Sequence, residues 1–186
     1  NFKIEDVDVF ANIKSLSLVA ARGLTIKDLQ ADFSYTSTNI TLKNLNLETL
    51  ESKIVGDIDL DYSKSRFADF VNDVVITANL KDSRIASNDL NTFYNEFGPD
   101  QLIFLDAELL GTLNNFTATD LTLKTADTDI RGDYVFQNIL DKEKEYVIVA
   151  NNHNISTHYF DLRRFMPRVL GDVIPVELKE LGSFYL

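Results

Sequence analysis

The stretch "LNLETLESKIVGDIDL", residues Leu45–Leu60, is followed by a second version of itself, "LTLKTADTDIRGDYVF", residues Leu121–Phe136. The two stretches align along their whole length without a gap. The aligned identities include leucines, a threonine, an isoleucine and a Gly-Asp pair: Leu45 with Leu121, Leu47 with Leu123, Thr49 with Thr125, Ile54 with Ile130, Gly56 with Gly132 and Asp57 with Asp133. An internal repeat of this length predicts a repetitive architecture.

Within each stretch, apolar and polar residues alternate with a period of two. Ile54, Ile58 and Leu60 fall on one face of an extended chain, whereas Asp57 and Asp59 fall on the other. This alternation is typical of a strand with one buried and one solvated face. The remaining strand candidates are Leu16–Leu18, Leu24–Ile26, Leu29–Tyr35, Ile40–Leu42, Leu45–Leu47, Val74–Leu80, Leu102–Leu109, Phe116–Ala118, Leu121–Leu123, Ile130–Phe136 and Tyr146–Ala150.

The alternation changes parity between Leu42 and Leu45, and again between Ala118 and Leu121. One inserted residue moves every following side chain to the opposite face of a strand. Each change therefore predicts a β-bulge or a tight bend. We expect a mainly β protein, an elongated and repetitive β-taco or β-solenoid-like sheet of short strands with short interspersed helices.

Two stretches carry a helical period instead. Leu90, Phe93, Tyr94 and Phe97 are spaced i, i+3, i+4, i+7, with Ser87 or Asn88 available as the cap and Gly98 as the stop. The second stretch has the same kind of face, ends at Gly171 and contains Pro167, which should kink or split it. Its apolar positions are Leu162, Phe165, Met166, Val169 and Leu170.

The helical stretches are also repeated: "DLNTF" at Asp89 recurs as "DLRRF" at Asp161. The number of residues between these two copies is smaller than the number between the two repeated strand stretches. We expect each unit to be a run of strands closed by a short helix. The chain is interpreted as one internal segment of a longer repeat protein, with approximate units 1–85 and 86–160 and a third unit begun at 161–186.

Composition excludes several classes of function. The formal net charge is −11 and cysteine is absent, which opposes nucleic-acid binding and leaves no thiolate for catalysis or metal ligation. No apolar run approaches the ~18 residues of a membrane-spanning helix. His153 and His158 have no companion ligands in the sequence, and alternating aspartates such as Asp57 and Asp59 would be spread about 7 Å apart along a strand. We therefore expect no enzyme activity, no metal site and no cofactor.

Stacked β repeats bury a continuous apolar face. If that face is rolled and left open, it forms a trough that could hold acyl chains, whereas a filled core is the plainer alternative. The candidate trough residues are the apolar-face positions of the two repeated stretches and their neighbours: Ile40, Leu42, Leu45, Leu47, Ile54, Ile58, Leu60, Leu121, Leu123, Ile130, Tyr134 and Phe136.

The stretch "GLTIKDLQADFSYTSTNITLKNLNLETLESKIVGDIDLDYS", followed by "RIASNDLNTFYNEF", resembles the TamB family (translocation and assembly module) within the AsmA-like group, in its Bacteroidota-type form. The resemblance spans most of residues 24–140 and rests on degenerate strand patterns together with the L-x-L-x-T-x4-I-x-G-D stretch. The chain has neither the family's membrane anchor nor its C-terminal domain, so it resembles an internal segment.

The resemblance implies a β-taco with a hydrophobic groove in a periplasmic protein that is anchored in the inner membrane and reaches the outer membrane. It implies phospholipid acyl chains and an outer-membrane assembly β-barrel as partners, and roles in phospholipid movement and outer-membrane protein assembly. The alternative is a cell-surface binding or adhesin module, a β-solenoid or sandwich with a closed core.

Overall fold

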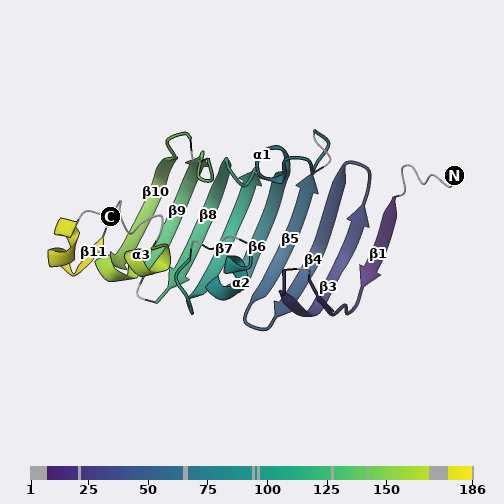
Figure 1. The fold of residues 1–186 in the computed structure, drawn as a ribbon, viewed down its shortest axis with the longest axis horizontal. Coiled ribbons are helices and arrows are strands. Elements are labelled where there is room, and N and C mark those ends of the chain that lie inside the picture. Colours follow the sequence, from purple (N-terminus) through teal and green to yellow (C-terminus); the bar gives the residue numbers. More distant parts are fainter. Residues whose placement is uncertain are drawn as a thin grey trace.

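The computed structural model describes residues 8–20, 22–64, 67–93, 95, 97–126, 128–141, 143–167 and 176–185. Eleven strands form one antiparallel sheet in the order β1-β3-β4-β5-β6-β7-β8-β9-β10-β11, with β2 beside β1 on the same edge of β3 (Figure 1). The strands are β1 (Val9–Ile13), β2 (Leu18–Val19), β3 (Thr25–Tyr35), β4 (Asn39–Thr49), β5 (Lys53–Asp61), β6 (Val75–Ala86), β7 (Leu102–Gly111), β8 (Phe116–Thr125), β9 (Thr128–Gln137), β10 (Val147–His158) and β11 (Ser183–Tyr185). The helices are α1 (Phe70–Asp73), α2 (Ser87–Asn91), α3 (Tyr159–Phe165) and the 3-10 helix η1 (Val176–Leu181).

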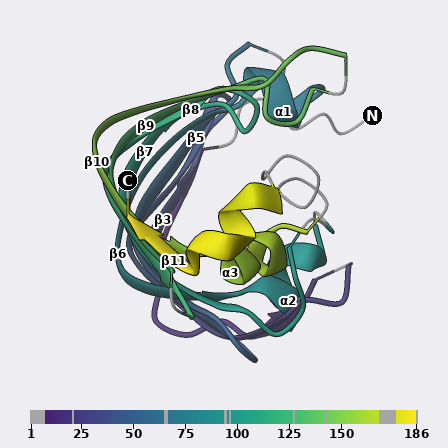
Figure 2. The ribbon, with the colours of Figure 1, turned by 90° about the vertical axis from the view of Figure 1, so that its left-hand side faces the viewer.

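Viewed along its length, the sheet is strongly curved and does not close on itself (Figure 2). Its concave side opens between two rims, with α1 near one rim and α2 near the other, and α3 and η1 lie on the concave side. The prediction of a mainly β, taco-like sheet with short interspersed helices is therefore confirmed.

The strands are longer than the sequence predicted. Ile40–Leu42 and Leu45–Leu47 are two halves of the single strand β4, and Phe116–Ala118 and Leu121–Leu123 are two halves of β8. The expectation of short strands was wrong at these points. The hydrogen-bond ladder resumes after each irregularity, so one strand continues across it.

Both parity changes are bulges, and they belong to a series. Every second strand from β4 to β10 contains one residue with positive φ at a register shift: Asn44 (51°), Asp82 (52°), Asp120 (50°) and Asn152 (48°). Asn and Asp tolerate this left-handed conformation better than other side-chain-bearing residues. The extra residue bends its strand and increases the local twist. The strand registers place these bulges in line across the sheet.

The bulge amides are held by carboxylates of the next strand. The Asn44 amide donates to Asp57 at 2.9 Å, and the Asp120 amide donates to Asp133 at 3.1 Å. The Asp82 amide donates to Asp106 in the same way. Asp57 and Asp133 lie on the solvated face, as the alternation predicts, and their hydrogen bonds to the bulge amides were not predicted. These bonds form because a bulge leaves an amide without a strand partner, and a carboxylate oxygen satisfies it.

The repeated glycines lie beside the same bulges. A Cβ on Gly56 would lie 2.0 Å from the Asn79 carbonyl oxygen, and one on Gly132 would lie 2.7 Å from the His153 Cα. Their φ values are +146° and +128°. The close approach and the positive φ both require glycine, because a side chain would collide with the backbone of the neighbouring strand and disfavours a positive φ.

The first predicted helix is shorter and earlier than expected. Helix α2 covers Ser87–Asn91, and Ser87 makes no cap bond, because its hydroxyl accepts from the Gln101 amide instead. After α2, Asn91 and Phe97 exchange hydrogen bonds of 3.0 and 3.1 Å that close a loop in place of a further helical turn. Tyr94 lies outside the described residues.

The second predicted helix begins early and stops at the proline. Helix α3 covers Tyr159–Phe165 and ends just before Pro167, as expected from the restriction that proline imposes on the preceding residue. The predicted positions Val169, Leu170 and Gly171 lie outside the described residues. The short helix α1, whose Asp69 side chain caps the Asn72 amide, was not predicted.

Strand order repeats along the chain. Strands β3 to β6 followed by α2 correspond to β7 to β10 followed by α3. Strands β6 and β10 are related by the same offset as α2 and α3, which is shorter than the offset between Leu45–Leu60 and Leu121–Phe136. The offset shortens because the connection 62–74 in the first unit is longer than the connection 138–146 in the second. Strand β11 pairs with β10 at the level where β7 begins to pair with β6.

We predict that Gly56→Ala lowers the free energy of unfolding by roughly 2–5 kcal/mol, because the new Cβ meets a fixed carbonyl at a positive φ. Urea denaturation followed by circular dichroism measures this. The control is Gly23→Ala, where φ is +89° but no atom lies within 4 Å; there we expect a loss of about 1–2 kcal/mol. Equal losses in the two variants would contradict the close approach at the bulge.

Candidate functional site: the concave face of the sheet

The strand registers place all twelve candidate residues on one face. Residues directly opposite in an antiparallel pair share a face. One row runs through Phe33, Leu42, Ile58, Ala78, Leu109, Ala118, Tyr134 and Ala150, from β3 to β10. A parallel row runs through Tyr35, Ile40, Leu60, Ile76, Gly111, Phe116, Phe136 and Ile148.

The bulges keep the two halves of each strand in phase. Leu42 and Leu45 differ in parity, yet both face the same side because the bulge at Asn44 absorbs one residue. Leu45 pairs with Gly56, and Leu121 pairs with Gly132, so a third apolar row continues below the bulge line. Leu47 opposite Ile54 and Leu123 opposite Ile130 belong to a fourth row.

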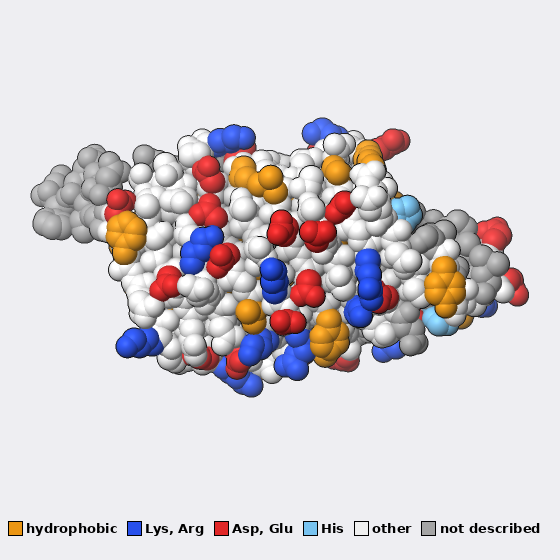
Figure 3. Space-filling model, turned by 180° about the vertical axis from the view of Figure 1, so that it is seen from behind, with side chains coloured by type: hydrophobic (Ala, Val, Ile, Leu, Met, Phe, Trp, Pro, Cys, Tyr) orange, Lys and Arg blue, Asp and Glu red, His pale blue; other side chains and the backbone are white. Residues whose placement is uncertain are grey.

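The opposite face is the charged one. Seen from behind, the convex side carries Lys, Arg, Asp and Glu side chains scattered along its length, with fewer hydrophobic side chains between them (Figure 3). Its ion pairs join Lys43 to Asp57 at 3.3 Å and Arg131 to Asp129 at 2.9 Å. The hydrogen bond from Arg131 lowers the pKa of Asp129. Asp59 on this face is half-buried and accepts from Asn39 at 3.3 Å. The apolar rows therefore line the concave face.

The apolar rows are only partly covered. Leu45, Leu121 and Tyr134 are buried, with 2%, 8% and 6% of their surface exposed. The other nine candidates are half-buried: Ile40, Leu42, Leu47, Ile54, Ile58, Leu60, Leu123, Ile130 and Phe136. A filled two-layer core would leave most of these side chains buried. A single curved layer leaves their tips accessible from the concave side.

The two repeats differ in the size of their concave side chains. Ile40, Ile58 and Leu60 in the first unit stand where Phe116, Tyr134 and Phe136 stand in the second. The second-unit rings stack on one another, with Phe116 and Phe136 centroids 4.6 Å apart. Burial raises the pKa of Tyr134, whose hydroxyl donates to the Arg131 carbonyl at 3.2 Å. These three positions are therefore aliphatic in the first unit and aromatic in the second.

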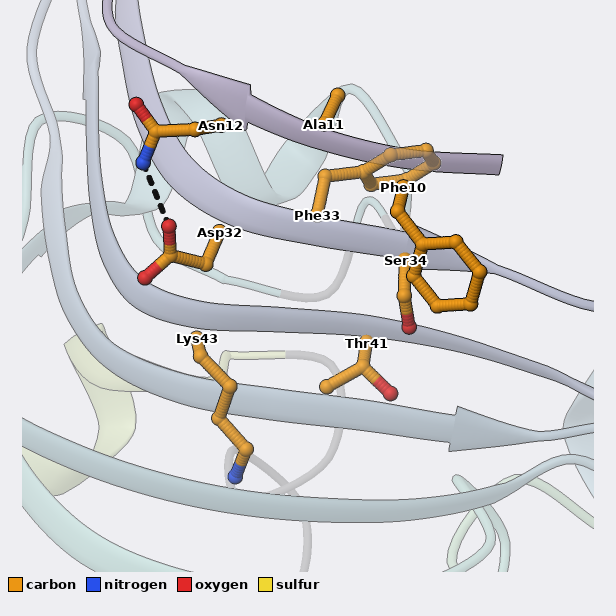
Figure 4. A pocket seen from close by; sticks show the side chains of 8 residues that line it. All are labelled: Phe10, Ala11, Asn12, Asp32, Phe33, Ser34, Thr41 and Lys43. Carbon is orange, nitrogen blue, oxygen red and sulfur yellow. Dashed lines mark hydrogen bonds between the residues drawn. The ribbon is translucent and has the colours of Figure 1, made fainter. Parts of the chain in front are cut away.

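A pocket on β1, β3 and β4 lies away from the candidate residues (Figure 4). Phe10, Ser34, Thr41 and Lys43 help to line it, and Asn12 donates to Asp32 at 2.6 Å beside it. The Asn44 and Asn12 side chains hold the pKa of Asp32 below its usual value. None of the twelve candidates lines this pocket.

Sequence reasoning missed a polar cluster between β10 and α3. The Ser183 hydroxyl and His158 Nε2 are 2.6 Å apart, and His158 Nδ1 lies 3.7 Å from an Asp161 carboxylate oxygen. The second distance is too long for a hydrogen bond, and His158 Nδ1 is buried without a partner among the described residues. The carboxylate thus does not orient the imidazole as a catalytic triad requires. The Ser183–His158 bond instead fastens β11 to β10.

Helix α2 is anchored to the sheet through a carboxylate. Asp89 accepts hydrogen bonds from Thr49 and Ser52, both buried residues at the β4–β5 turn. In the second unit the equivalent Asp161 does not reach Thr125, whose buried hydroxyl has no partner in the part of the chain that the structure describes. Thr49 and Thr125 are the last residues of β4 and β8.

Comparison with known proteins gave no match among protein-family models, curated proteins or solved structures. Within the described part of the chain, no helix has the length and apolarity needed to cross a bilayer. In that same part, no group of three or more His, Cys, Asp or Glu is arranged to hold a metal ion.

We predict that Asp89→Ala lowers the free energy of unfolding by roughly 1.5–3 kcal/mol, because two buried hydroxyls lose a charged acceptor. The matched control is Asp161→Ala, which removes the equivalent carboxylate of the second unit and should cost less than about 0.5 kcal/mol. Urea denaturation of both variants measures the difference. A loss at Asp161 as large as that at Asp89 would mean that α3 is anchored like α2.

Proposed function

We propose that this chain is a periplasmic segment of a TamB/AsmA-like protein, whose concave face carries phospholipid acyl chains between the inner and outer membranes. The observation that supports the proposal is the continuous, partly exposed set of apolar rows from β3 to β10. A role of the parent protein in outer-membrane protein assembly, beside an assembly β-barrel, belongs to the same proposal.

The dimensions of the rows suit an acyl chain. Eight strands at about 4.8 Å spacing make the rows about 34 Å long. An extended acyl chain covers half of a bilayer's hydrocarbon core, or about 15 Å. Each methylene taken out of water contributes about 0.8 kcal/mol. A chain lying across the strands would cover the exposed tips of Leu42, Ile58 and their neighbours, and the binding needs no catalytic group.

The division of the two faces suits a phospholipid as well. The concave side offers aliphatic and aromatic contacts, whereas the convex side is charged and remains in water. Because nine of the concave candidates keep part of their surface exposed, a polar headgroup can stay hydrated while its acyl chains lie against the sheet. Desolvating a phosphate would be costly, and the open geometry avoids that cost.

The resemblance to the TamB family supports the proposed periplasmic location and the proposed partners, phospholipid and an assembly β-barrel. The L-x-L-x-T-x4-I-x-G-D stretch falls on β4, its turn and β5, where it provides two concave rows and the bulge acceptor Asp57. The alternative of a closed-core adhesin module is less favoured, because nine apolar candidates keep part of their surface exposed.

The lipid proposal predicts that the purified chain binds phospholipid and that Ile58→Asp weakens binding at least about tenfold, since a charge must be desolvated beneath an acyl chain. Native mass spectrometry detects co-purified lipid, and titration with a fluorescent phospholipid gives the affinity. Circular dichroism verifies that the variant is folded.

The matched control is Thr119→Asp, which adds the same charge on the exposed convex side of β8. It should bind lipid like the unaltered chain. If the unaltered chain binds no phospholipid, or if Ile58→Asp unfolds the sheet while Thr119→Asp does not, the concave face is a structural core and the proposal is wrong.

A further inference from the structure

A pocket of about 480 Å³, distinct from the one on β1, β3 and β4, lies on the convex side of the sheet over β4, β5 and β6. Each of these three strands has a hydrogen-bonded neighbour on both sides, so the pocket belongs to the interior of the sheet. Its volume falls in the range of small-molecule sites. We call it the β5 pocket, and it is lined by Asn44, Leu45, Asn46, Val55, Gly56, Asp57, Asn79 and Lys81.

Two bulges flank the β5 pocket. Asn44 on β4 and Asp82 on β6 have positive φ on either side of β5. The ladders that β5 makes with its two neighbours are interrupted near them. The Val55 amide and carbonyl bond instead to the Ser83 hydroxyl, at 3.0 and 3.1 Å. Because a bulge disrupts the ladder locally, the pocket arises from the same irregularities that set the strand registers.

Three polar side chains of the β5 pocket are not engaged. Asn46, Asn79 and Lys81 make no side-chain hydrogen bond or ion pair with another residue in the described part of the chain. Asn46 and Asn79 are half-buried, on strands about 10 Å apart with β5 between them. Polar groups that lose water on folding without gaining a partner are destabilising. A ligand that hydrogen-bonds to both amides offsets that loss.

The charges of the β5 pocket select against ions. Among the described residues that line it, Asp57 and Lys81 are the charged ones, and their charges are opposite. One carboxylate is too few for a calcium ion, which takes six to eight oxygen ligands. The same carboxylate repels a phosphate group. The pocket therefore favours a neutral ligand.

The polar groups of the β5 pocket match hydroxyls. Each asparagine amide both donates and accepts hydrogen bonds, the Lys81 ammonium donates and the Asp57 carboxylate accepts. A hydroxyl does both, so a ligand with several hydroxyls satisfies all of these groups. We propose that the β5 pocket binds a neutral saccharide. Its hydroxyls bond to the two amides, Asp57 and Lys81, and its C–H groups contact the apolar side chain of Val55.

The second unit lacks this combination of side chains. Arg131 stands in place of Val55, and Thr122 stands in place of Asn46. The Arg131 side chain is long and charged, and it bonds to Asp129 at 2.9 Å. The recognition groups are therefore specific to the first unit, and the repeat itself supplies a substitution that should fill the pocket.

The pocket on β1, β3 and β4 has similar chemistry (Figure 4). It has a volume of about 430 Å³, and the Ser34 hydroxyl and the Phe10 ring help to line it. Asn44 connects the two pockets, because it lines the β5 pocket and its side chain donates to Asp32 of the other at 2.8 Å. A saccharide of more than one ring can therefore occupy both pockets along the convex side.

Titration of the ¹⁵N-labelled chain with neutral trisaccharides tests the proposal. The probes are maltotriose, cellotriose and N-acetylchitotriose, which differ in linkage and in their N-acetyl groups. We expect at least one of them to cause saturable shifts of the side-chain amide signals of Asn46 and Asn79. Val55→Arg, which copies the second unit, should weaken that binding at least about tenfold. Thr119→Arg adds the same side chain on the exposed convex side of β8, outside both pockets, and should bind like the unaltered chain.

Asn79→Ala supplies a second variant that removes no side-chain hydrogen bond within the described part of the chain, so the fold should be kept. It should weaken binding roughly twofold to tenfold, the effect of losing one hydrogen bond to the ligand. Circular dichroism verifies that each variant is folded.

No shift with any of the three trisaccharides would overturn the proposal, as would binding that survives both Val55→Arg and Asn79→Ala. Inorganic phosphate is the control ligand. If it shifts the same signals as strongly, the pocket is an anion site and the proposal is wrong. The titration contains no lipid and reports on the convex side, so its failure is distinguishable from a failure of acyl-chain binding on the concave face.

Discussion

The hydrogen bond between a bulge amide and an aspartate of the next strand sets the shape of this molecule. Asn44 with Asp57, Asp82 with Asp106, and Asp120 with Asp133 repeat this contact across the sheet. Each bulge inserts one residue and bends its strand, and the carboxylate satisfies the amide that the bulge leaves unpaired. Because the bulges lie in line on alternate strands, the bends add up and the sheet curves.

The same bulges decide where the apolar residues lie. Without the inserted residue, Leu45 and Leu47 would face the charged convex side while Leu42 faced the concave one. With it, four apolar rows share the concave face, and the surface facing water carries the charges. Curvature and amphipathicity are thus one property of the fold. The proposed path for acyl chains depends on it.

Sequence patterns predicted much of this architecture. Period-two alternation located most strands, and the parity changes at Leu42 and Ala118 located two of the bulges. The bulges at Asp82 and Asn152 were missed, because they interrupt β6 and β10 at "LKDS" and "NNHN", where the apolar alternation simply stops. The alternation correctly placed Asp57 on the solvated face. Its hydrogen bond to the Asn44 amide was missed, because a hydrogen bond to an amide of another strand leaves no trace in local sequence.

The helices were harder to predict for a related reason. The apolar spacing of Leu90, Phe93 and Phe97 fits a helix, but mutual hydrogen bonds between Asn91 and Phe97 end it after one turn. The side chain of Ser87 is likewise taken by Gln101 rather than by the helix. Contacts between residues distant in the sequence outweighed the local propensity. The candidate residues of the concave face were easier to predict, because the alternation within each half of a strand, together with the two predicted bulges, places them on one face.

The most direct test of the account is methyl NMR of the chain with a phospholipid that carries a spin label on its acyl chain. The label broadens the signals of methyl groups near the bound chain. The account predicts broadening at Leu42, Leu47 and Leu123 on the concave face, and sharp signals at Leu110 and Val135 on the convex face. Equal broadening on the two faces, or none on either, would contradict it.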